Sequence, residues 1–178
     1  MIHHVDPRLA LLAAEPQSPT ALEAVESPGL YAWWTAGAIP WPASFPPVDP
    51  DVPAYVGKAD TESLASRFMN DHLGRTRGSA LRRSLAALLS DELDLRTSLV
   101  IGTRKRPSKF GLNAAGEERL TRWMLSHLSV TWVSLVDPGD DEEALIQNLH
   151  PPLNDVHAVG SVYRVPMRTL RASFAASR

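Results

Sequence analysis

The chain has 178 residues, of which 44% are hydrophobic, so it is long enough for one sizeable core and too short for two comfortable domains. It contains no cysteine, which excludes a disulfide framework, a thiolate nucleophile and a cysteine-based zinc site. No apolar run reaches the roughly 18 residues that a membrane-spanning helix needs, and the formal net charge of −2 argues against general polyanion binding. We therefore expect a single soluble domain in the cytoplasm, with no membrane partner.

The first half of the chain is predicted to contain helices at both ends and two strands between them. Helical patterns cover PRLALLAA and, after a Ser-Pro pair, SPTALEAVE; the aromatic run GLYAWW then predicts a strand. Six prolines fall between Pro40 and Pro53, so the connection to the second strand, AYVG, is an extended loop. Further helices are predicted over about 62–73 and at SALRRSLAALLS, where leucines repeat with helical spacing.

The second half alternates between strands and helices. TSLVIGT predicts a strand, RKRPSK a loop, AAGEERLTRWMLSHL a helix and SVTWVSLV another strand. A final pair of helices, DDEEALIQNL and MRTLRASFAAS, brackets the segment HPPLND. This order indicates a mixed α and β domain with few strands and more helices.

Charge is distributed unevenly along the chain. Residues 67–109 carry ten Lys and Arg against four Asp and Glu, a local net charge of +6, which leaves −8 for the remainder. Such a segment predicts a basic face for phosphate groups, or else arginines that solvate the surfaces of two helices.

Two tyrosines lie on the two strands that the proline-rich segment connects. Because side chains alternate along a strand, Tyr31 shares a face with Trp33, and Tyr55 shares a face with Gly57. Gly57 permits close approach of another group, or an unusual φ, at the end of its strand. If the strands pair antiparallel, both phenols lie on one side of the sheet; the alternative is that they are ordinary residues at the edge of the core.

Arg67 lies at the flank of the apolar stripe that Leu64 and Phe68 define on the helix of residues 62–73. Its guanidinium offers a planar fork of donors that suits a phosphate and stays charged at any working pH. The alternative is an i, i+4 ion pair with Asp71.

Glu142 occupies a position where a leucine is expected. On a helical wheel it falls within about 13° of the centre of the stripe formed by Leu145, Ile146 and Leu149. A carboxylate at the end of a buried stripe costs several kcal/mol unless a cation, a donor or water compensates for its burial. The alternative is that the acid is there because helix N-termini favour negative charge.

These residues occur in one order: GLY, then YVG, then L-x-x-R, then E-x-x-L-I-x-x-x-x-P-x-x-N. From Leu30 to Asn154 this order and spacing resembles the GIY-YIG nuclease family. Two features differ from the family: the proline-rich insertion at 36–52, and Asp71 where many relatives carry a histidine four residues after the arginine. His72 follows one position later, and one residue is a 100° rotation on an α-helix. We therefore name His72 as a supporting residue, and the alternative is a histidine in solvent or in the core.

The resemblance implies an α/β (α+β) fold with a small central antiparallel sheet of about three strands, flanked by helices. The family-like core is expected at about 28–156, with an N-terminal helical extension at 1–27 and a C-terminal helix at 157–178. It further implies a metal-dependent endonuclease acting on DNA. Tyr31 is expected to activate water, with a hydrogen bond from Tyr55, Arg67 to hold the phosphate and Glu142 to bind Mg²⁺ or Mn²⁺.

Other residues are expected to support this site. Lys58 favours a phenolate or contacts phosphate, unless it is a solvated turn lysine, and Asn154 fixes the local backbone through its amide. Four arginines are expected to contact backbone phosphates outside the reaction centre: Arg75, Arg77, Arg82 and Arg83. The competing interpretation is a non-cleaving nucleic-acid-binding module on the same scaffold, because the chain is acidic overall and the histidine is displaced. A third is an interaction domain with no nucleic-acid role.

Overall fold

The computed structural model describes residues 6–101 and 109–177. The first half of the described chain contains seven elements in this order: α1 (Pro7–Ala13), the 3-10 helix η1 (Pro19–Ala24), β1 (Gly29–Trp34), β2 (Tyr55–Ala59), α2 (Leu64–Arg67), the π-helix η2 (Phe68–His72) and α3 (Ala80–Leu88). The second half contains six more: β3 (Thr97–Ile101), β4 (Lys109–Leu112), α4 (Ala114–His127), β5 (Ser129–Ser134), α5 (Gly139–Leu149) and α6 (Arg164–Ala176).

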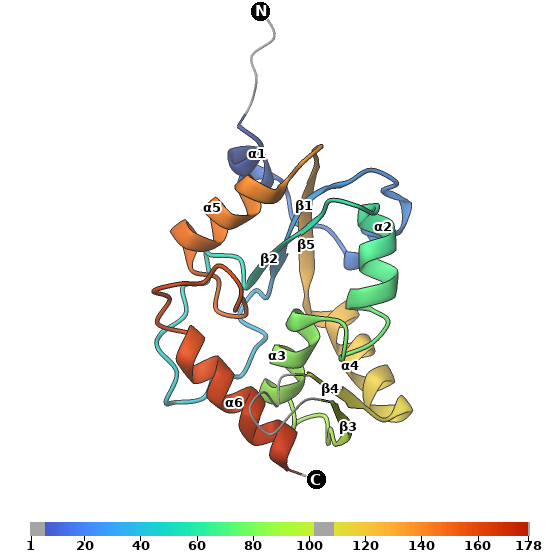
Figure 1. The fold of residues 1–178 in the computed structure, drawn as a ribbon, viewed down its shortest axis with the longest axis vertical. Coiled ribbons are helices and arrows are strands. Elements are labelled where there is room, and N and C mark those ends of the chain that lie inside the picture. Colours follow the sequence, from blue (N-terminus) through green and yellow to red (C-terminus); the bar gives the residue numbers. More distant parts are fainter. Residues whose placement is uncertain (1–5, 102–108, 178) are drawn as a thin grey trace, which may run out of the picture.

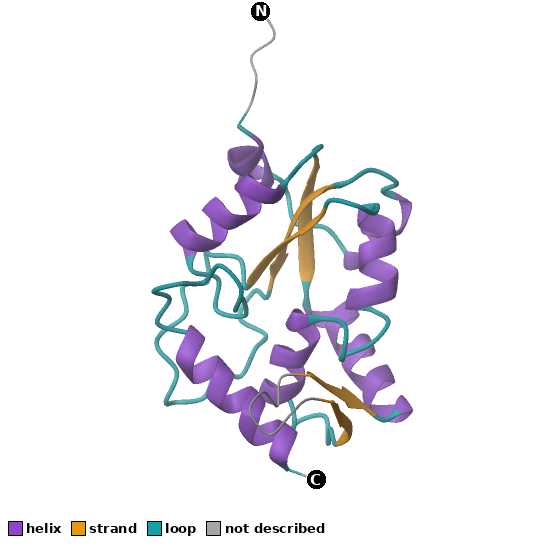
Figure 2. Ribbon diagram, viewed as in Figure 1, coloured by secondary structure: helices purple, strands orange, loops and turns teal. Residues whose placement is uncertain are grey.

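A three-stranded antiparallel sheet in the order β2-β1-β5 lies at the centre of the molecule (Figure 2). The middle strand, β1, has five of its six residues buried, as its apolar and aromatic sequence requires. The mixed α and β fold, with a small antiparallel sheet flanked by helices, is confirmed. β2 is an edge strand, so one row of its backbone groups is open to other partners.

The two faces of the sheet carry different cores. Tyr31 and Trp33 belong to the larger core, together with Phe68 of η2 and residues of α3. Leu30 and Ala32 belong to the smaller core, which α1 and α5 cover. Figure 1 shows α5 and α2 on either side of the sheet, with β2 between them. The alternation predicted for GLYAWW is confirmed by this separation.

The proline-rich segment between β1 and β2 packs against the domain. Ile39 and Phe45 are buried in the larger core, and the ring of Phe45 stacks between those of Trp41 and Tyr163. The Tyr163 hydroxyl donates a hydrogen bond to the Pro47 carbonyl at 2.7 Å. The insertion is therefore joined to the start of α6.

Two predicted elements differ in detail, and a third is not described. SPTALEAVE forms a 3-10 helix of six residues, whose N-cap Ser18 makes no capping hydrogen bond. TSLVIGT forms β3, which pairs with β4 in a separate hairpin and not with the central sheet. The loop predicted at RKRPSK lies outside the described residues except for Lys109, which begins β4.

The predicted helix over 62–73 is one α-helical turn followed by a π-helical turn. The amide of Leu73 donates to the carbonyl of Phe68 at 2.8 Å, the i to i+5 bond of a π-helix. A π-turn holds one residue more than an α-turn, so the side chains after Arg67 do not follow the 100° spacing assumed from sequence.

The terminal helices pack onto this core. Leu11 of α1 is fully buried in the smaller core, and Met167 and Phe174 of α6 are buried in the larger one. The predicted boundaries of core and extensions remain a prediction. Among the described helices, none combines the length and apolar content that crossing a membrane requires.

Candidate active site

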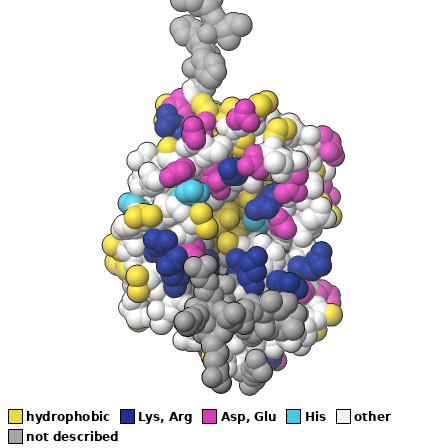
Figure 3. Space-filling view, viewed as in Figure 1, with side chains coloured by type: hydrophobic (Ala, Val, Ile, Leu, Met, Phe, Trp, Pro, Cys, Tyr) yellow, Lys and Arg dark blue, Asp and Glu magenta, His cyan; other side chains and the backbone are white. Residues whose placement is uncertain are grey.

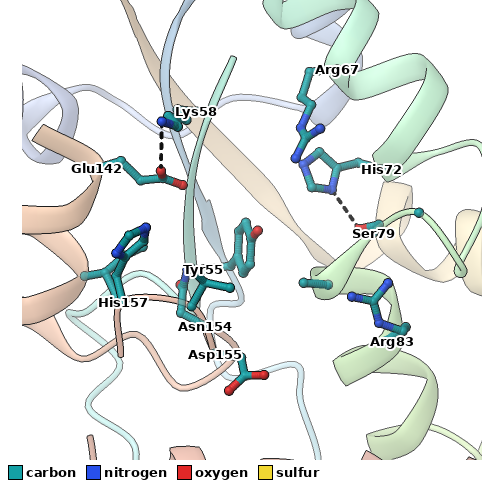
Figure 4. Close-up of a pocket in the computed structure, with 14 residues that line it drawn as sticks. Tyr55, Lys58, Arg67, His72, Ser79, Arg83, Glu142, Asn154, Asp155 and His157 are labelled. Carbon is teal, nitrogen blue, oxygen red and sulfur yellow. Dashed lines mark hydrogen bonds and ion pairs between the residues drawn. The ribbon is translucent and has the colours of Figure 1, made fainter. Parts of the chain in front are cut away.

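A cavity of about 300 Å³ opens at the free edge of β2. Its two sides, shown in Figure 4, come from opposite faces of the sheet. One side, here the Glu142 wall, includes Lys58 on β2, Glu142 on α5 and His157 beside it. The other, here the His72 wall, consists of side chains from α2, η2 and the start of α3: Arg67, His72, Ser79 and Arg83. Tyr55 lies between the two walls.

The two phenols lie on the same face of the sheet. In the antiparallel register, Tyr31 pairs with Gly57 and Trp33 pairs with Tyr55. Their surroundings differ: Tyr55 is 8% exposed and lines the cavity, whereas Tyr31 is 1% exposed and lies behind it. Burial raises the pKa of Tyr55, and burial together with nearby Tyr55 and Glu142 raises that of Tyr31 well above its usual value of 10, although Arg67 opposes both shifts.

Gly57 allows the Tyr31 ring to lie across β2. A Cβ atom at position 57 would be 2.6 Å from Cζ of Tyr31, so any other residue would displace the ring. The sequence gave two possible reasons for this glycine, close approach of another group or an unusual φ. The structure shows close approach.

His72 lies in the core, which is one of the two places expected for it, and it also lines the cavity, which the 100° rotation expected from sequence did not anticipate. Its Nε2 is 2.7 Å from the Tyr31 hydroxyl, its Nδ1 is 3.0 Å from Oγ of Ser79, and the residue is 2% exposed. The expectation assumed a regular α-helix. Because η2 is π-helical, the fifth residue after Arg67 takes the place that the fourth would take on an α-helix. Burial, with Arg67 and Arg82 nearby, lowers the pKa of His72 to about 3.

Arg67 makes the predicted ion pair and still presents a free edge. Its Nη1 donates to Asp71 at 2.5 Å and to Glu62 at 3.4 Å. Within residues 6–101 and 109–177, Nε is buried without a hydrogen-bond partner and Nη2 makes none. A phosphate can accept two parallel hydrogen bonds from the Nε and Nη2 edge of a guanidinium. Burial acts to lower the pKa of Arg67, but Tyr31 and Asp71 raise it above its usual value.

Glu142 points toward the cavity from the first turn of α5. Its side chain is 13% exposed, while Glu143 next to it is 48% exposed. Its nearest cation is Nζ of Lys58 at 3.8 Å, and Lys58 also contacts Asp60 at 3.0 Å. No described residue donates a hydrogen bond to the Glu142 carboxylate. Burial raises its pKa, and Lys58 opposes that shift.

The acids at the cavity suit a divalent cation that keeps most of its water. No cluster of three or more His, Asp or Glu that would hold a metal occurs among the described residues. Of the two carboxylates that line the cavity, Asp155 is held by arginines of α6, including Arg168 at 2.6 Å. Glu142 is the one with unshared oxygens. A single carboxylate with several waters is a usual Mg²⁺ environment, so the residues present fit this ion.

The four arginines proposed to contact DNA fall into different places. Arg75 and Arg77 are exposed between η2 and α3, and Arg83 lines the cavity. Arg82 has no exposed surface; its Nη2 is 2.6 Å from Glu117 of α4. The expectation for Arg82 is therefore wrong, because a guanidinium enclosed between helices cannot reach a phosphate. In Figure 3, Lys and Arg side chains lie below a hollow with an apolar floor.

Asn154 holds the free edge of β2. Its side-chain oxygen accepts from the Val56 amide at 2.9 Å and its nitrogen donates to the Val56 carbonyl at 2.8 Å. These two bonds replace a neighbouring strand next to Tyr55. The amide therefore positions the backbone of β2, and the residue also lines the cavity.

Ser79 was not identified from the sequence. It is 2% exposed, begins α3 as the N-cap, and contacts His72. The available signal was the N-cap pattern of serine directly before the helix ALRRSLAAL, which predicts a capping role but not contact with a histidine seven residues earlier.

Comparison with protein families matches residues 29–173 to the family described as the GIY-YIG catalytic domain. Neither the curated proteins nor the solved structures gave a significant match. The match covers most of the chain, including both tyrosine motifs, the arginine and the glutamate. Together with the three-stranded sheet and the cavity at its edge, it shows that this chain belongs to the GIY-YIG nuclease family.

Proposed function

We propose that this protein is a metal-dependent endonuclease that hydrolyses phosphodiester bonds in DNA. The observation that carries the proposal is the pairing of two unsatisfied groups across one cavity. On one side Arg67 lines the cavity with a guanidinium whose Nε makes no hydrogen bond with a described residue and whose charge faces Tyr31, and on the other Glu142 presents a carboxylate whose nearest described cation is Lys58 at 3.8 Å. A phosphate with a divalent cation complements both groups.

Hydrolysis requires an activated water, a positive charge beside the phosphate and help for the departing oxygen. Arg67 holds the non-bridging phosphate oxygens through its Nε and Nη2 edge, while Asp71 and Glu62 fix its Nη1. Glu142 holds the divalent cation, Mg²⁺ or Mn²⁺. When bound there, such an ion supplies Lewis-acid stabilisation of the charge on the phosphate.

Tyr31, once its own proton has passed to Nε2 of His72, accepts the proton of the attacking water as the phenolate, and Tyr55 orients that water through its hydroxyl. Tyr55 lines the cavity and its hydroxyl makes no hydrogen bond with a described residue. Tyr31 lies next to Arg67, which favours its ionised form, and contacts His72. Because burial raises the pKa of both phenols, neither ionises readily at neutral pH without further positive charge, which a divalent cation held at Glu142 would bring.

Binding of the DNA strand extends beyond the scissile phosphate. Arg83 lies on the His72 wall, where its Nε is buried without a partner among the described residues and its Nη1 donates to the Arg77 carbonyl at 2.7 Å. With Arg75 and Arg77 exposed beside it, this edge of the cavity suits a neighbouring backbone phosphate. Contacts of this kind position the strand without reading its bases.

The test is cleavage of supercoiled plasmid DNA by the purified protein, with and without Mg²⁺. We expect nicking that requires the metal, and we expect Glu142→Gln to lower it by about 10³-fold because the charge that holds the cation is lost. The variant should be at least as stable as the parent, since burial disfavours the charged form that the substitution removes.

Glu143→Gln is the matched control, because Glu143 is adjacent on α5 and turns into solvent. It should cleave like the parent protein. Retained cleavage by Glu142→Gln would reject the role of Glu142. A salt-sensitive mobility shift without nicking would support the non-cleaving binding module, and absence of both results would exclude DNA as the partner.

A further inference from the structure

We propose that Ser79 binds substrate: its hydroxyl donates to a phosphate oxygen at the N-terminus of α3, where Arg83 supplies the positive charge. These groups form a second phosphate subsite on the His72 wall, separate from the one at Arg67. The occupant is the phosphate next to the scissile one in a DNA strand, and this identity rests on the proposed function.

The hydrogen bonds behind the cavity have a direction that is set at Tyr31. Its buried hydroxyl has one hydrogen, and Nε2 of His72, 2.7 Å away, is the acceptor within hydrogen-bonding distance among the described residues. An imidazole that accepts at Nε2 carries its hydrogen on Nδ1, which donates it to Oγ of Ser79 at 3.0 Å. When the Tyr31 proton passes to Nε2, Nδ1 remains a donor, because both nitrogens of a charged imidazole donate.

Ser79 therefore has both lone pairs in use and a hydrogen left to donate. One lone pair accepts from His72, and the other accepts from the backbone amide of Arg82 at 3.2 Å, as the N-cap of α3. No described residue lies at hydrogen-bonding distance as an acceptor for the hydroxyl hydrogen. Ser79 is 2% exposed and lines the cavity. A buried hydroxyl hydrogen needs an acceptor, and a ligand in the cavity can supply it.

The start of α3 adds backbone donors at the same place. This helix has nine residues, and its N-terminus carries the partial positive charge of the helix dipole. The Ala80 amide has no acceptor among the described residues. Gly78, Ser79 and Ala80 all line the cavity, and none has a side chain larger than that of serine. A helix N-terminus that is open in this way suits a phosphate.

Arg83 brings a charge that no described carboxylate neutralises. Its Nη1 donates to the Arg77 carbonyl at 2.7 Å, and its Nε is buried without a hydrogen-bond partner among the described residues. The nearby carboxylate of Asp155 forms ion pairs with three arginines of α6 instead. Burial lowers the pKa of Arg83, and an anion beside it would offset that cost.

The subsite differs from the one at Arg67 in its position and in its pairing. Arg67 lies on α2 and forms an ion pair with Asp71, whereas Arg83 lies on α3 and makes no such pair with a described residue. In Figure 4, Arg67 and Arg83 lie on opposite sides of Ser79. One strand can therefore place its scissile phosphate at Arg67 and the next phosphate between Ser79 and Arg83.

The first measurement uses inorganic phosphate and no DNA. Phosphate is titrated into the full-length protein while ¹H–¹⁵N NMR follows the Ala80 amide and the Nε–H of Arg67, and we expect both signals to shift with saturation. Arg83→Gln should weaken the Ala80 response by about tenfold, because a charged donor is lost, and should retain the Arg67 response. Arg122→Gln removes an equal charge from an exposed pair outside the cavity and should change neither signal.

Asparagine and aspartate at position 79 separate donation to phosphate from the structural roles of Ser79. Both are good N-cap residues and both offer an oxygen that accepts from His72, but ionised aspartate has no hydrogen to donate. Ser79→Asn should keep the Ala80 response, and Ser79→Asp should abolish it. The Arg67 response in Ser79→Asp measures how far the added negative charge acts across the cavity, and it should fall less than the Ala80 response.

The second measurement identifies the occupant. Binding of a thymidine dinucleotide, which has one phosphodiester, is compared with binding of the trinucleotide, which has two, in EDTA so that no metal supports cleavage. We expect the trinucleotide to bind about tenfold more tightly, because its second phosphate accepts hydrogen bonds from a charged group. This gain should disappear in Arg83→Gln, and also when one linkage of the trinucleotide is a neutral methylphosphonate.

The outcomes separate this subsite from the proposed cleavage. An Ala80 amide that does not respond to phosphate in the parent protein, or that responds equally in Ser79→Asn and Ser79→Asp, overturns the subsite. A phosphate response without the trinucleotide gain overturns a neighbouring strand phosphate as its occupant. If both measurements succeed and plasmid DNA is not nicked, the proposed function fails and the subsite stands.

Discussion

The two walls of the cavity are built in opposite ways. Behind the His72 wall, polar groups are enclosed and paired: Arg82 contacts Glu117, and His72 contacts Tyr31 and Ser79. On the Glu142 wall, the cation nearest to the carboxylate among the described residues is a lysine at 3.8 Å, and no described residue donates a hydrogen bond to it. Groups fixed before binding can stabilise a developing charge without reorganising, whereas an open carboxylate retains its capacity for a cation. The difference suggests that one wall supplies fixed donors and the other supplies the ion.

The largest expected effect comes from breaking the ion pair behind the His72 wall. Arg82→Met should lower the free energy of unfolding by about 3–5 kcal/mol, because it leaves Glu117 without the guanidinium that neutralises it. Arg122→Met is the control, since Arg122 and Glu118 form an equally short pair with side chains 70% and 71% exposed. That control should change stability by less than about 1 kcal/mol. Equal losses in urea unfolding would contradict the structural role given to Arg82.

Next in size is the loss of the guanidinium edge at the cavity. Arg67→Lys should lower cleavage by about 10³-fold while the protein stays folded, because an ammonium cannot donate bidentately to phosphate. Arg96→Lys, at a side chain that is 72% exposed, should cleave normally. The measurement is the rate of plasmid nicking with circular dichroism of each variant. Normal cleavage by Arg67→Lys would contradict the role of Arg67 in holding the phosphate.

Replacing each tyrosine by phenylalanine compares the contributions to cleavage of the enclosed Tyr31 hydroxyl and of the Tyr55 hydroxyl at the cavity. Tyr31→Phe should slow cleavage by about 10²-fold, the lower range for loss of a general base. Tyr55→Phe should have a smaller effect, since it removes a hydrogen bond to water. Single-turnover rates at saturating Mg²⁺ provide the measurement. The reverse order would make Tyr55, which lines the cavity, the base.

The last prediction concerns the pH dependence of stability, where the change within one pH unit is small. His72 has a pKa of about 3 in the folded protein and about 6.5 when unfolded, so the unfolded state binds more protons between these values. Stability should therefore fall as pH is lowered from 6.5, by at most about 1.4 kcal/mol per pH unit from this group. In denaturant titrations at several pH values, the stability of His72→Gln should fall less steeply with decreasing pH than that of the parent protein. Both proteins contain the same carboxylates, so the difference between the two curves reports on His72. Parallel curves would show that His72 is not held neutral.

Several features of the site followed from local patterns. Alternation on β1 and β2 put both phenols on one face, and the register confirmed it. The helical wheel directed Glu142 inward, and its side chain is 13% exposed against 48% for Glu143. These predictions held because strand and helix periodicities depend on backbone geometry alone.

The place of His72 and the fate of Arg82 could not be derived in this way. The π-turn of η2 is a departure from regular spacing that the residues 62–73 do not signal, and Arg82 shares the sequence RR with Arg83, which lines the cavity. Whether an arginine can be buried depends on an acid from another element, here Glu117 from α4.

The sequence by itself determined the order of elements, the faces of the strands and the inward direction of Glu142, since each depends on a repeat within one segment. Only the tertiary structure decided that His72 reaches Tyr31, that Ser79 contacts His72 and that Arg82 is enclosed. Those contacts join segments of different elements. Their free energies depend on partners and burial that no single stretch of the chain contains.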